Sequence, residues 1–418
     1  MVRMSEEPVR VIRCGRLIDG TGGAPVEDAV VVIRGERITA VGGAGEVEVP
    51  EDAEVIDASG MTVMPGLIDA HVHFSGARSH RFGERILVPE GVRLLRAARD
   101  AEAALEAGYT TMKCCGGKNS LYLKRAIKEG TIRGPRIVAA GYALTQTFGH
   151  GDMHYFPLDY VKKLNPALCD GKEDCIRAAR FALREGADFI KVSTTGGVMS
   201  ERDRPESTQF TLEELEAIVQ EARHVGTFCT AHAQGTEGVK NAIKAGFKTI
   251  DHGIYLDDEA IEMMKERDVI LVPTFSIVKQ IIDHGADHGI VEWGLRKARE
   301  AYKAHIDSCR RAYEAGVKIA AGTDFGSAPL FRMGTNAMEL GLLVKNCGMT
   351  PMEALVATTK TAAEACGLEK ETGTIEAGKQ ADLIVVDGDP LGDVRILEKI
   401  ERIRLVMKAG VVEVNRGL

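Results

Sequence analysis

The two ends of the chain share short apolar runs that are typical of β-strands. Near the N-terminus, runs rich in Val and Ile are separated by Gly and Asp, which are common in turns. They are VRVIRCGRLIDG, DAVVVIRGERITAVGG and AEVIDASG, and RGER lies where a hairpin turn is expected. The C-terminal part has the same texture in ADLIVVDGDP and IRLVMKAGVVEV. The pattern predicts two β-rich ends around a different middle.

The middle of the chain alternates apolar runs with amphipathic helical patterns. Eight runs have strand length: LIDAHVHF, YTTMKCC, RIVAAG, ADFIKVS, TFCTAHA, KTIDHG, VILVPTF and VKIAAGTDFG. One helical pattern is TLEELEAIVQEARHVG, in which Thr211 and Glu214 form a capping box. A later helix is expected to begin at Thr350-Pro351, with Glu353 at its third position. Eight strands alternating with helices predict an α/β fold, the (β/α)8 or TIM barrel.

Composition and charge narrow the function classes. Of 418 residues, 44% are hydrophobic and 27% charged, so a large core is expected and disorder is not. The net charge of -8 and the lack of a basic stripe disfavour nucleic-acid binding. No apolar run reaches about 18 residues and none resembles a signal peptide, so no membrane span is expected. Scattered cysteines without a CxxC pair indicate reduced thiols, and we expect a cytoplasmic protein.

Polar side chains recur where the predicted barrel strands end, at the face where barrels place their active sites. They are His71, His73, Lys191, His232, His252 and Asp324. His71 and His73 are two residues apart, so they point to the same side of their strand. Taken singly, each has a plain structural explanation, such as a core histidine, a pair of His252 with Asp251, or a turn at Asp324. Together, imidazoles and a carboxylate at one face predict a site for divalent metal ions.

Lys191 is the unusual member of this set, because it lies at the centre of the buried strand FIKV. Lysine is seldom buried without a partner, and its ammonium group does not bind a metal ion as it stands. Reaction with carbon dioxide would convert the amine into a carbamate, an anion able to bridge two ions about 3.5–4 Å apart. The structural alternative is a lysine that extends to the barrel mouth or pairs with Asp324.

Six motifs carry a family resemblance: GLIDAHVH, FIKV, TAHA, IDHG and GTDFG, followed by GTIEAGKQADLIVVD. Over nearly the whole chain, they resemble those of the amidohydrolase superfamily. The resemblance implies a metal-dependent (β/α)8 catalytic domain at residues 64–374 and a small composite β-sandwich domain from residues 1–63 and 375–418. It also implies a binuclear centre in which zinc is the expected ion. One ion would be held by His71, His73 and Asp324, the other by His232 and His252, with Lys191 as a bridging N6-carboxylysine.

Three loop segments resemble the prolidase-like branch of this superfamily. They are GHGD at 149–152, GGVMSERDRPESTQF at 196–210 and HGIYLDDE at 252–259. Members of this branch cleave Xaa-Pro dipeptides or N-acyl amino acids, and imidazolonepropionase is a more distant relative. The resemblance implies attack on the amide by a metal-bridging hydroxide, with Asp324 acting first as base and then as acid.

Residues of these loops are candidates for binding such a small-molecule substrate. His150 is expected to donate a hydrogen bond to the substrate carbonyl; the alternative is a loop histidine that holds Asp152 or the backbone. Tyr255, and Arg202 or Arg204, are candidates for the substrate carboxylate. Because relatives are often homo-oligomers, a homo-oligomer is expected.

Other activities on the same scaffold stay open. They are an Xaa-Arg/Lys dipeptidase or carboxypeptidase, and an imidazolonepropionase-like cyclic amide hydrolase or deaminase. Mononuclear enzymes of the latter type lack the bridging lysine, so Lys191 favours a binuclear hydrolase. A non-catalytic assembly protein that has lost its ligands is a third alternative, but here every ligand position is filled.

Overall fold

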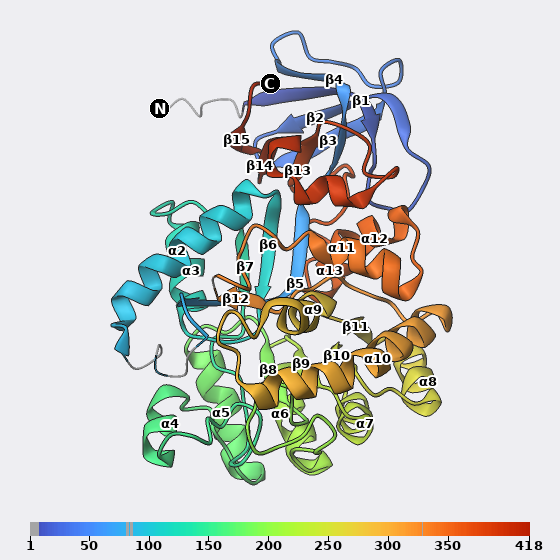
Figure 1. Ribbon diagram of the computed structural model, residues 1–418. Helices are drawn as coiled ribbons and strands as arrows, with labels where there is room; N and C mark the ends of the chain where they lie inside the picture. The colour runs from blue at the N-terminus through green and yellow to red at the C-terminus, as the bar shows by residue number, and fades with distance from the viewer. Residues whose placement is uncertain (1–7, 81–82, 84–86, 328) are drawn as a thin grey trace.

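The computed structural model describes residues 8–80, 83, 87–327 and 329–418 (Figure 1). Within these ranges the strands form one sheet of seven strands, from both ends of the chain, and two of four strands, from the middle. Seven of the eight apolar runs of the middle contain one strand each, as predicted. The eighth, VKIAAGTDFG, overlaps only the start of β12 (Phe325–Ser327), so Asp324 precedes this strand instead of ending it. Residues 1–7, part of the expected composite domain, lie outside the described residues.

The seven-stranded sheet joins the two ends of the chain, seen in Figure 1 as blue and red strands at the top. Its strands in spatial order are β15 (Val411–Asn415), β14 (Ile403–Lys408), β13 (Leu383–Val386), β4 (Glu54–Pro65), β1 (Val9–Leu17), β2 (Val26–Arg34) and β3 (Arg37–Gly43). Gly35 (φ 58°) and Glu36 form the β2–β3 turn predicted at RGER. Side chains alternate along these strands, and one face, including Ile12, Val63 and Leu383, forms a shared apolar core.

The strands of the middle form two sheets in which every pairing is parallel. One has the order β12 (Phe325–Ser327), β5 (Leu67–Ala77), β6 (Tyr109–Cys114) and β7 (Arg136–Ala139). The other has the order β11 (Ile270–Val272), β10 (Thr249–His252), β9 (Cys229–Ala233) and β8 (Ile190–Ser193). Isolated parallel bridges pair Val192 of β8 with Leu144, beyond the end of β7, and Leu271 of β11 with Ile319, ahead of β12. The strands therefore run in one direction and end on one side.

Helices follow the strands along the chain and lie around them (Figure 1). The α-helices are α2 (Glu90–Glu106), α3 (Asn119–Lys128), α4 (Leu158–Leu164), α5 (Lys172–Arg184), α6 (Leu212–His224), α7 (Thr236–Ala245), α8 (Asp258–Glu266), α9 (Phe275–His284), α10 (Glu292–Glu314), α11 (Met338–Leu342), α12 (Pro351–Thr358) and α13 (Lys360–Ala365). A π-helical turn, η1 (Leu343–Cys347), and two 3-10 turns, η2 (Val394–Glu398) and η3 (Ile400–Arg402), complete them. The expected capping box is present at Thr211, and the helix expected at Thr350-Pro351 begins there with a capping box of its own.

Strand alternation decides which side chains reach the centre of the molecule. On β8, Ile190 and Val192 belong to the main apolar core together with Ala178 and Ala182 of α5. Lys191, between them, therefore points to the opposite side of the strand, away from α5.

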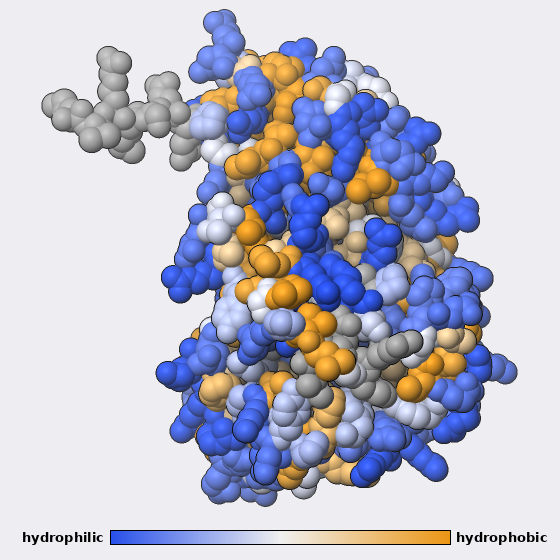
Figure 2. Space-filling view, turned by 60° about the vertical axis from the view of Figure 1, so that its left-hand side comes forward, coloured by the Kyte–Doolittle hydropathy of each residue, from blue (hydrophilic) through white to orange (hydrophobic). Residues whose placement is uncertain are grey.

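The surface and the cysteines agree with the composition. Figure 2 shows hydrophilic side chains over most of one face, with hydrophobic ones in separate patches. The nine cysteines are all buried and free, as expected for reduced thiols. Across the described ranges, no helix is both long enough and apolar enough to span a bilayer.

Candidate metal centre

Four histidines and one aspartate meet at the carboxyl ends of the parallel strands. The histidines are His71 and His73 on β5, His232 on β9 and His252 on β10; Asp324 directly precedes β12. The Oδ1 atom of Asp324 lies 3.4 Å from His71 Nε2 and 3.1 Å from His73 Nε2. The ring centroids of His232 and His252 are 4.6 Å apart, and those of His71 and His252 are 5.2 Å apart. The structure thus brings five of the six predicted ligands together.

Three residues around this cluster have a left-handed backbone. The φ angle is 78° at His252, 59° at Thr274 and 61° at Asp324. Such a conformation costs on the order of 1–3 kcal/mol in residues other than glycine, and it is concentrated at functional sites. Here it turns side chains at strand ends toward the cluster.

Two of the histidines have their Nδ1 atom occupied by a neutral group. His73 Nδ1 lies 3.2 Å from the carbonyl oxygen of Gly116, and His252 Nδ1 lies 2.7 Å from the hydroxyl of Thr274. Each ring therefore keeps its Nε2 atom for another partner, as a metal ligand requires.

The other two histidines use different atoms. His232 Nε2 lies 3.1 Å from the carbonyl oxygen of Gly196, which leaves its Nδ1 atom available. His71 Nδ1 lies 3.2 Å from the Oδ2 atom of Asp251. This contact is not a hydrogen bond, because His71 Nδ1 is buried without a hydrogen-bond partner. The other carboxylate oxygen, Asp251 Oδ1, also has no partner. Every histidine of the cluster thus offers one nitrogen to a ligand.

Lys191 reaches the cluster through Asp251. Its ammonium group is buried and forms an ion pair with the Asp251 carboxylate, rather than with Asp324. With Lys191 unmodified, burial would raise the pKa of Asp251, but Lys191 and His71 hold that pKa well below its usual range. Burial would likewise lower the pKa of Lys191, and Asp251 raises it above its usual value instead.

The pKa values of His232 and His252 are shifted in the opposite direction to that of His71. Burial is the main reason why the pKa values of His232 and His252 lie well below the usual range, so these imidazoles are neutral, the form that binds metal ions. Burial would also lower the pKa of His71, but Cys115, Asp251 and Asp324 hold it well above its usual value. A metal ion at His71 therefore has to displace a proton.

The donor set fits divalent ions. His71, His73 and Asp324 offer ligand atoms within 4.8 Å of one another, and so do His71, Cys115 and Asp251. Imidazole and carboxylate are common ligands for zinc and similar ions. His71 Nδ1 and Asp251 Oδ1 are buried without a hydrogen-bond partner, so the hydrogen bonding of the cluster is incomplete while Lys191 is unmodified.

His150 stacks on His232, with ring centroids 4.0 Å apart. Its Nδ1 atom lies 3.0 Å from the hydroxyl of Ser200, and its backbone N–H donates to Gln209 Oε1. Gly197 makes room for it, because a Cβ atom there would come within 2.3 Å of His150 Cε1. The structure places His150 beside the cluster, and its backbone and ring are held by the segment after β8.

The three candidates for the substrate carboxylate lie further out. Tyr255 follows β10 and is half-buried against a small apolar core that includes Val198. Arg202 and Arg204 are exposed in the loop after β8. Among the residues that the structure describes, no hydrogen bond or ion pair joins these three side chains to the histidines. Their roles stay predictions.

The sequence did not predict that Asp251 and Cys115 lie in contact with the cluster. Asp251 was expected at most as a local pair of His252, but it contacts His71 and Lys191. Cys115, at the end of β6, lies within ligand distance of His71 and Asp251. The only signal in the sequence is their position at strand ends, which does not specify these partners.

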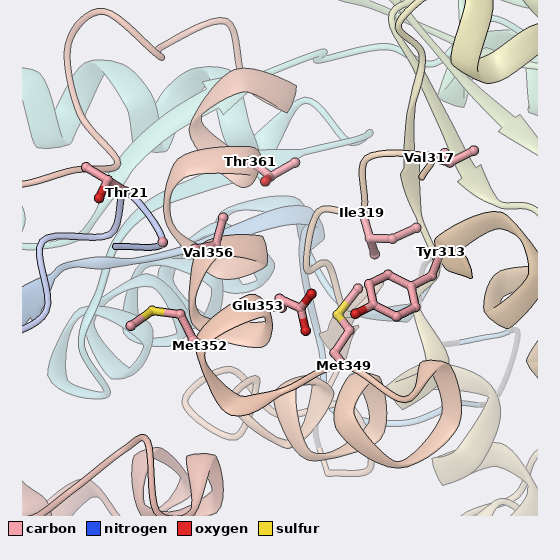
Figure 3. A pocket seen from close by; sticks show the side chains of 10 residues that line it. Thr21, Tyr313, Val317, Ile319, Met349, Met352, Glu353, Val356 and Thr361 are labelled. Carbon is pink, nitrogen blue, oxygen red and sulfur yellow. The ribbon is translucent and has the colours of Figure 1, made fainter. Parts of the chain in front are cut away.

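A separate cavity of about 270 Å³ lies away from the cluster (Figure 3). Met349, Met352, Val356 and Tyr313 line it, with Glu353 among them. Glu353 is already occupied in the capping box of α12. With none of the predicted ligands in its wall, this cavity is not a candidate for the catalytic site.

Comparison with known proteins agrees with this geometry. A profile of the amidohydrolase family matches residues 62–412. The chain is 35% identical to the ochratoxinase of Aspergillus niger over 97% of this chain and 86% of that protein. It is 29% identical to an imidazolonepropionase of a Geobacillus species, over 87% of this chain and 84% of the other.

Solved structures give the same result. The A. niger ochratoxinase superimposes with a TM-score of 0.89 at 34% identity, covering 99% of this chain and 97% of that one. An Xaa-Pro dipeptidase with methionine in its active site has a TM-score of 0.88 at 34% identity, covering 97% and 100%. A prolidase complexed with N-methylphosphonate-L-proline has a TM-score of 0.89 at 31% identity, covering 97% and 100%. The chain belongs to the amidohydrolase family and is a hydrolase acting on carbon–nitrogen bonds.

Proposed function

We propose that this protein is a binuclear metal-dependent amidohydrolase that cleaves Xaa-Pro dipeptides or N-acyl amino acids. The observation that carries the proposal is the meeting of four histidines, Asp324 and buried Lys191 at the ends of parallel strands. Structural relatives that include an Xaa-Pro dipeptidase and a prolidase support the substrate class.

The architecture we propose is a (β/α)8 barrel, residues 64–374, with a composite β-sandwich domain from residues 1–63 and 375–418. The two parallel sheets support a closed barrel, and so do the bridges from β8 and β11 to the segments that follow β7 and precede β12. The pairing of β4 with β1 and β13 supports a composite domain.

Two divalent ions, with zinc as the expected metal, would be held by the side chains of this cluster. His71, His73 and Asp324 would hold one, and His232 and His252 the other. Lys191 would bridge them after carboxylation. In that reaction the ammonium loses a proton, its nitrogen bonds to the carbon of carbon dioxide, and the carbamic acid loses a second proton. The ions would supply a hydroxide at neutral pH and polarise the scissile carbonyl.

The chain's own residues would manage the protons and the developing charge. Asp324 lies at hydrogen-bond distance from two ligand histidines, so its carboxylate is fixed at the centre of the site. It would accept a proton from the nucleophilic water and pass it to the leaving amine. His150, held by Ser200, would donate a hydrogen bond to the oxyanion.

The substrate carboxylate would bind at the rim of the site. Tyr255, and Arg202 or Arg204 in the loop after β8, are the proposed partners. A guanidinium can bind a carboxylate with two parallel hydrogen bonds, and both arginines are exposed.

Metal analysis and a substrate screen test the proposal together. We expect about two divalent ions per chain and turnover of members of an Xaa-Pro, Xaa-Arg/Lys and N-acyl amino acid panel. Lys191→Ala should lose the bridge and reduce kcat/KM at least about 100-fold, given the size of metal and second-shell effects. Lys240→Ala is the matched control. Lys240 lies on α7 and pairs with Asp257 and Glu259 at the start of α8, not with the histidine cluster. No turnover on any panel member would contradict the proposed substrate class.

A second candidate is an imidazolonepropionase-like hydrolase or deaminase, favoured by the similarity to imidazolonepropionases. One ion per chain and hydrolysis of a cyclic amide would support it. No bound ion at all would point to a non-catalytic assembly protein. The homo-oligomer and the cytoplasmic location stay predictions.

A further inference from the structure

Asp251 is a fully buried carboxylate at the heart of the cluster that the catalytic scheme does not use. Consecutive residues of a strand normally point to opposite faces, so Asp251 and His252 are not expected to share one. The left-handed backbone at His252 ends this alternation. As a result, Asp251 faces His71 and Lys191 while His252 also reaches the cluster.

Among the residues that the structure describes, Asp251 is the only charged group at the far nitrogen of a ligand histidine. The far nitrogens of His73 and His232 face backbone carbonyls, and that of His252 faces a hydroxyl. His71 alone has a carboxylate at its far nitrogen, 3.2 Å away. A carboxylate there fixes which ring nitrogen carries the proton and makes the other nitrogen a stronger ligand.

Lys191 competes for the same carboxylate. The unmodified ammonium group pairs with Asp251 Oδ2, the oxygen that also lies nearest to His71 Nδ1. Carboxylation replaces this cation with an anion, which no longer attracts Asp251. Within the described part of the chain, His71 Nδ1–H is then the remaining donor in contact with Asp251.

We propose that Asp251 is the positioning residue of His71. It pairs with Lys191 while that lysine is unmodified, and it orients His71 through Nδ1–H once Lys191 is carboxylated, leaving Nε2 for the metal ion. This inference rests on the proposed binuclear function. Asp251 is adjacent to His252 in the sequence, but the residue it would position is His71, which is a ligand of the other ion.

Metal titration of Asp251→Asn tests this role. In a competition titration with a chromophoric chelator, wild-type protein is expected to show two dissociation constants. The Asn variant should weaken one of them by about 10–100-fold and leave the other within about threefold. Thr274→Val removes the neutral hydrogen-bond partner of His252. This variant should instead weaken binding of the ion held by His232 and His252. Asp257→Asn, a partly exposed aspartate at the start of α8, is the control of equal charge change.

The outcomes separate the inference from the function on which it rests. If wild-type protein binds no divalent ion, the proposed function fails. If wild-type protein binds two ions and Asp251→Asn changes neither constant, or weakens both equally, the positioning role is wrong. Should the Asn variant not fold, nitrogen-15 spectra of histidine in the loaded wild-type protein decide. A hydrogen-bonded proton on His71 Nδ1 supports the role, and a bare or metal-bound Nδ1 overturns it.

Discussion

At the scale of single residues, Glu339 makes the free energy of unfolding depend on pH. This buried carboxylate on α11 accepts hydrogen bonds from the backbone N–H groups of Phe275 and Ser276 and from the Ser276 hydroxyl. Burial outweighs these bonds and raises the pKa of Glu339 from 4.5 to about 7. Between these values the folded state binds more protons than the unfolded state, so stability falls as the pH rises.

The variant Glu339→Gln isolates this effect. The free energy of unfolding of the wild type, relative to the variant, should fall by about 3 kcal/mol between pH 4.5 and pH 7.5. Denaturant unfolding of both proteins at several pH values measures it, and groups that titrate in both cancel. Parallel curves for the two proteins would show that Glu339 does not titrate in this range.

Residue types at the centre were predictable, but their contacts were not. Lys191 stands out in the sequence because a lysine inside a strand needs a reason, and the histidines stand out by their places at strand ends. Asp251 faces Lys191 and the next residue, His252, reaches the same cluster, because the left-handed φ angle at His252 ends the strand alternation. Histidine is not glycine, so nothing in the sequence marks that backbone conformation.

At the scale of elements, the start of α12 shows how local signals fix a helix. Thr350 accepts from the Glu353 backbone N–H, and the Glu353 side chain accepts from the Thr350 backbone N–H. We expect Thr350→Ala to lower the free energy of unfolding by about 1 kcal/mol. Residues of α12 line the separate cavity, which contains none of the proposed metal ligands. We therefore expect kcat/KM to stay unchanged. Thr350→Ser keeps the hydroxyl as a control, and an equal loss in both variants would argue against the cap.

Strand lengths were less predictable than strand number. The run VILVPTF contains only β11, Ile270–Val272, because Pro273 has no N–H and Thr274 is left-handed. The run VKIAAGTDFG divides into a segment that bridges β11 at Ile319 and the later strand β12. Between them lies Gly322, where a Cβ atom would come within 2.5 Å of Val272. Apolar runs show where strands lie, while packing at the centre decides where they end.

At the scale of the whole molecule, stability depends on both ends of the chain meeting in one sheet. β4 lies between β1, from the N-terminal part, and β13, from the C-terminal part, with Val63 paired to Val385. Deleting residues 375–418 would leave β4 with a free edge and expose the apolar core around Leu383 and Leu405. Long free edges and exposed apolar faces promote aggregation.

The shortened chain, residues 1–374, is therefore expected to be insoluble when produced alone. Co-production of residues 375–418 as a separate chain should restore soluble protein, since the strand pairing does not require a covalent link. Soluble yield and binding of a hydrophobic dye measure both effects. A soluble, cooperatively folding chain of residues 1–374 would show instead that the parallel sheets and their helices are stable without the sheet formed by the two ends.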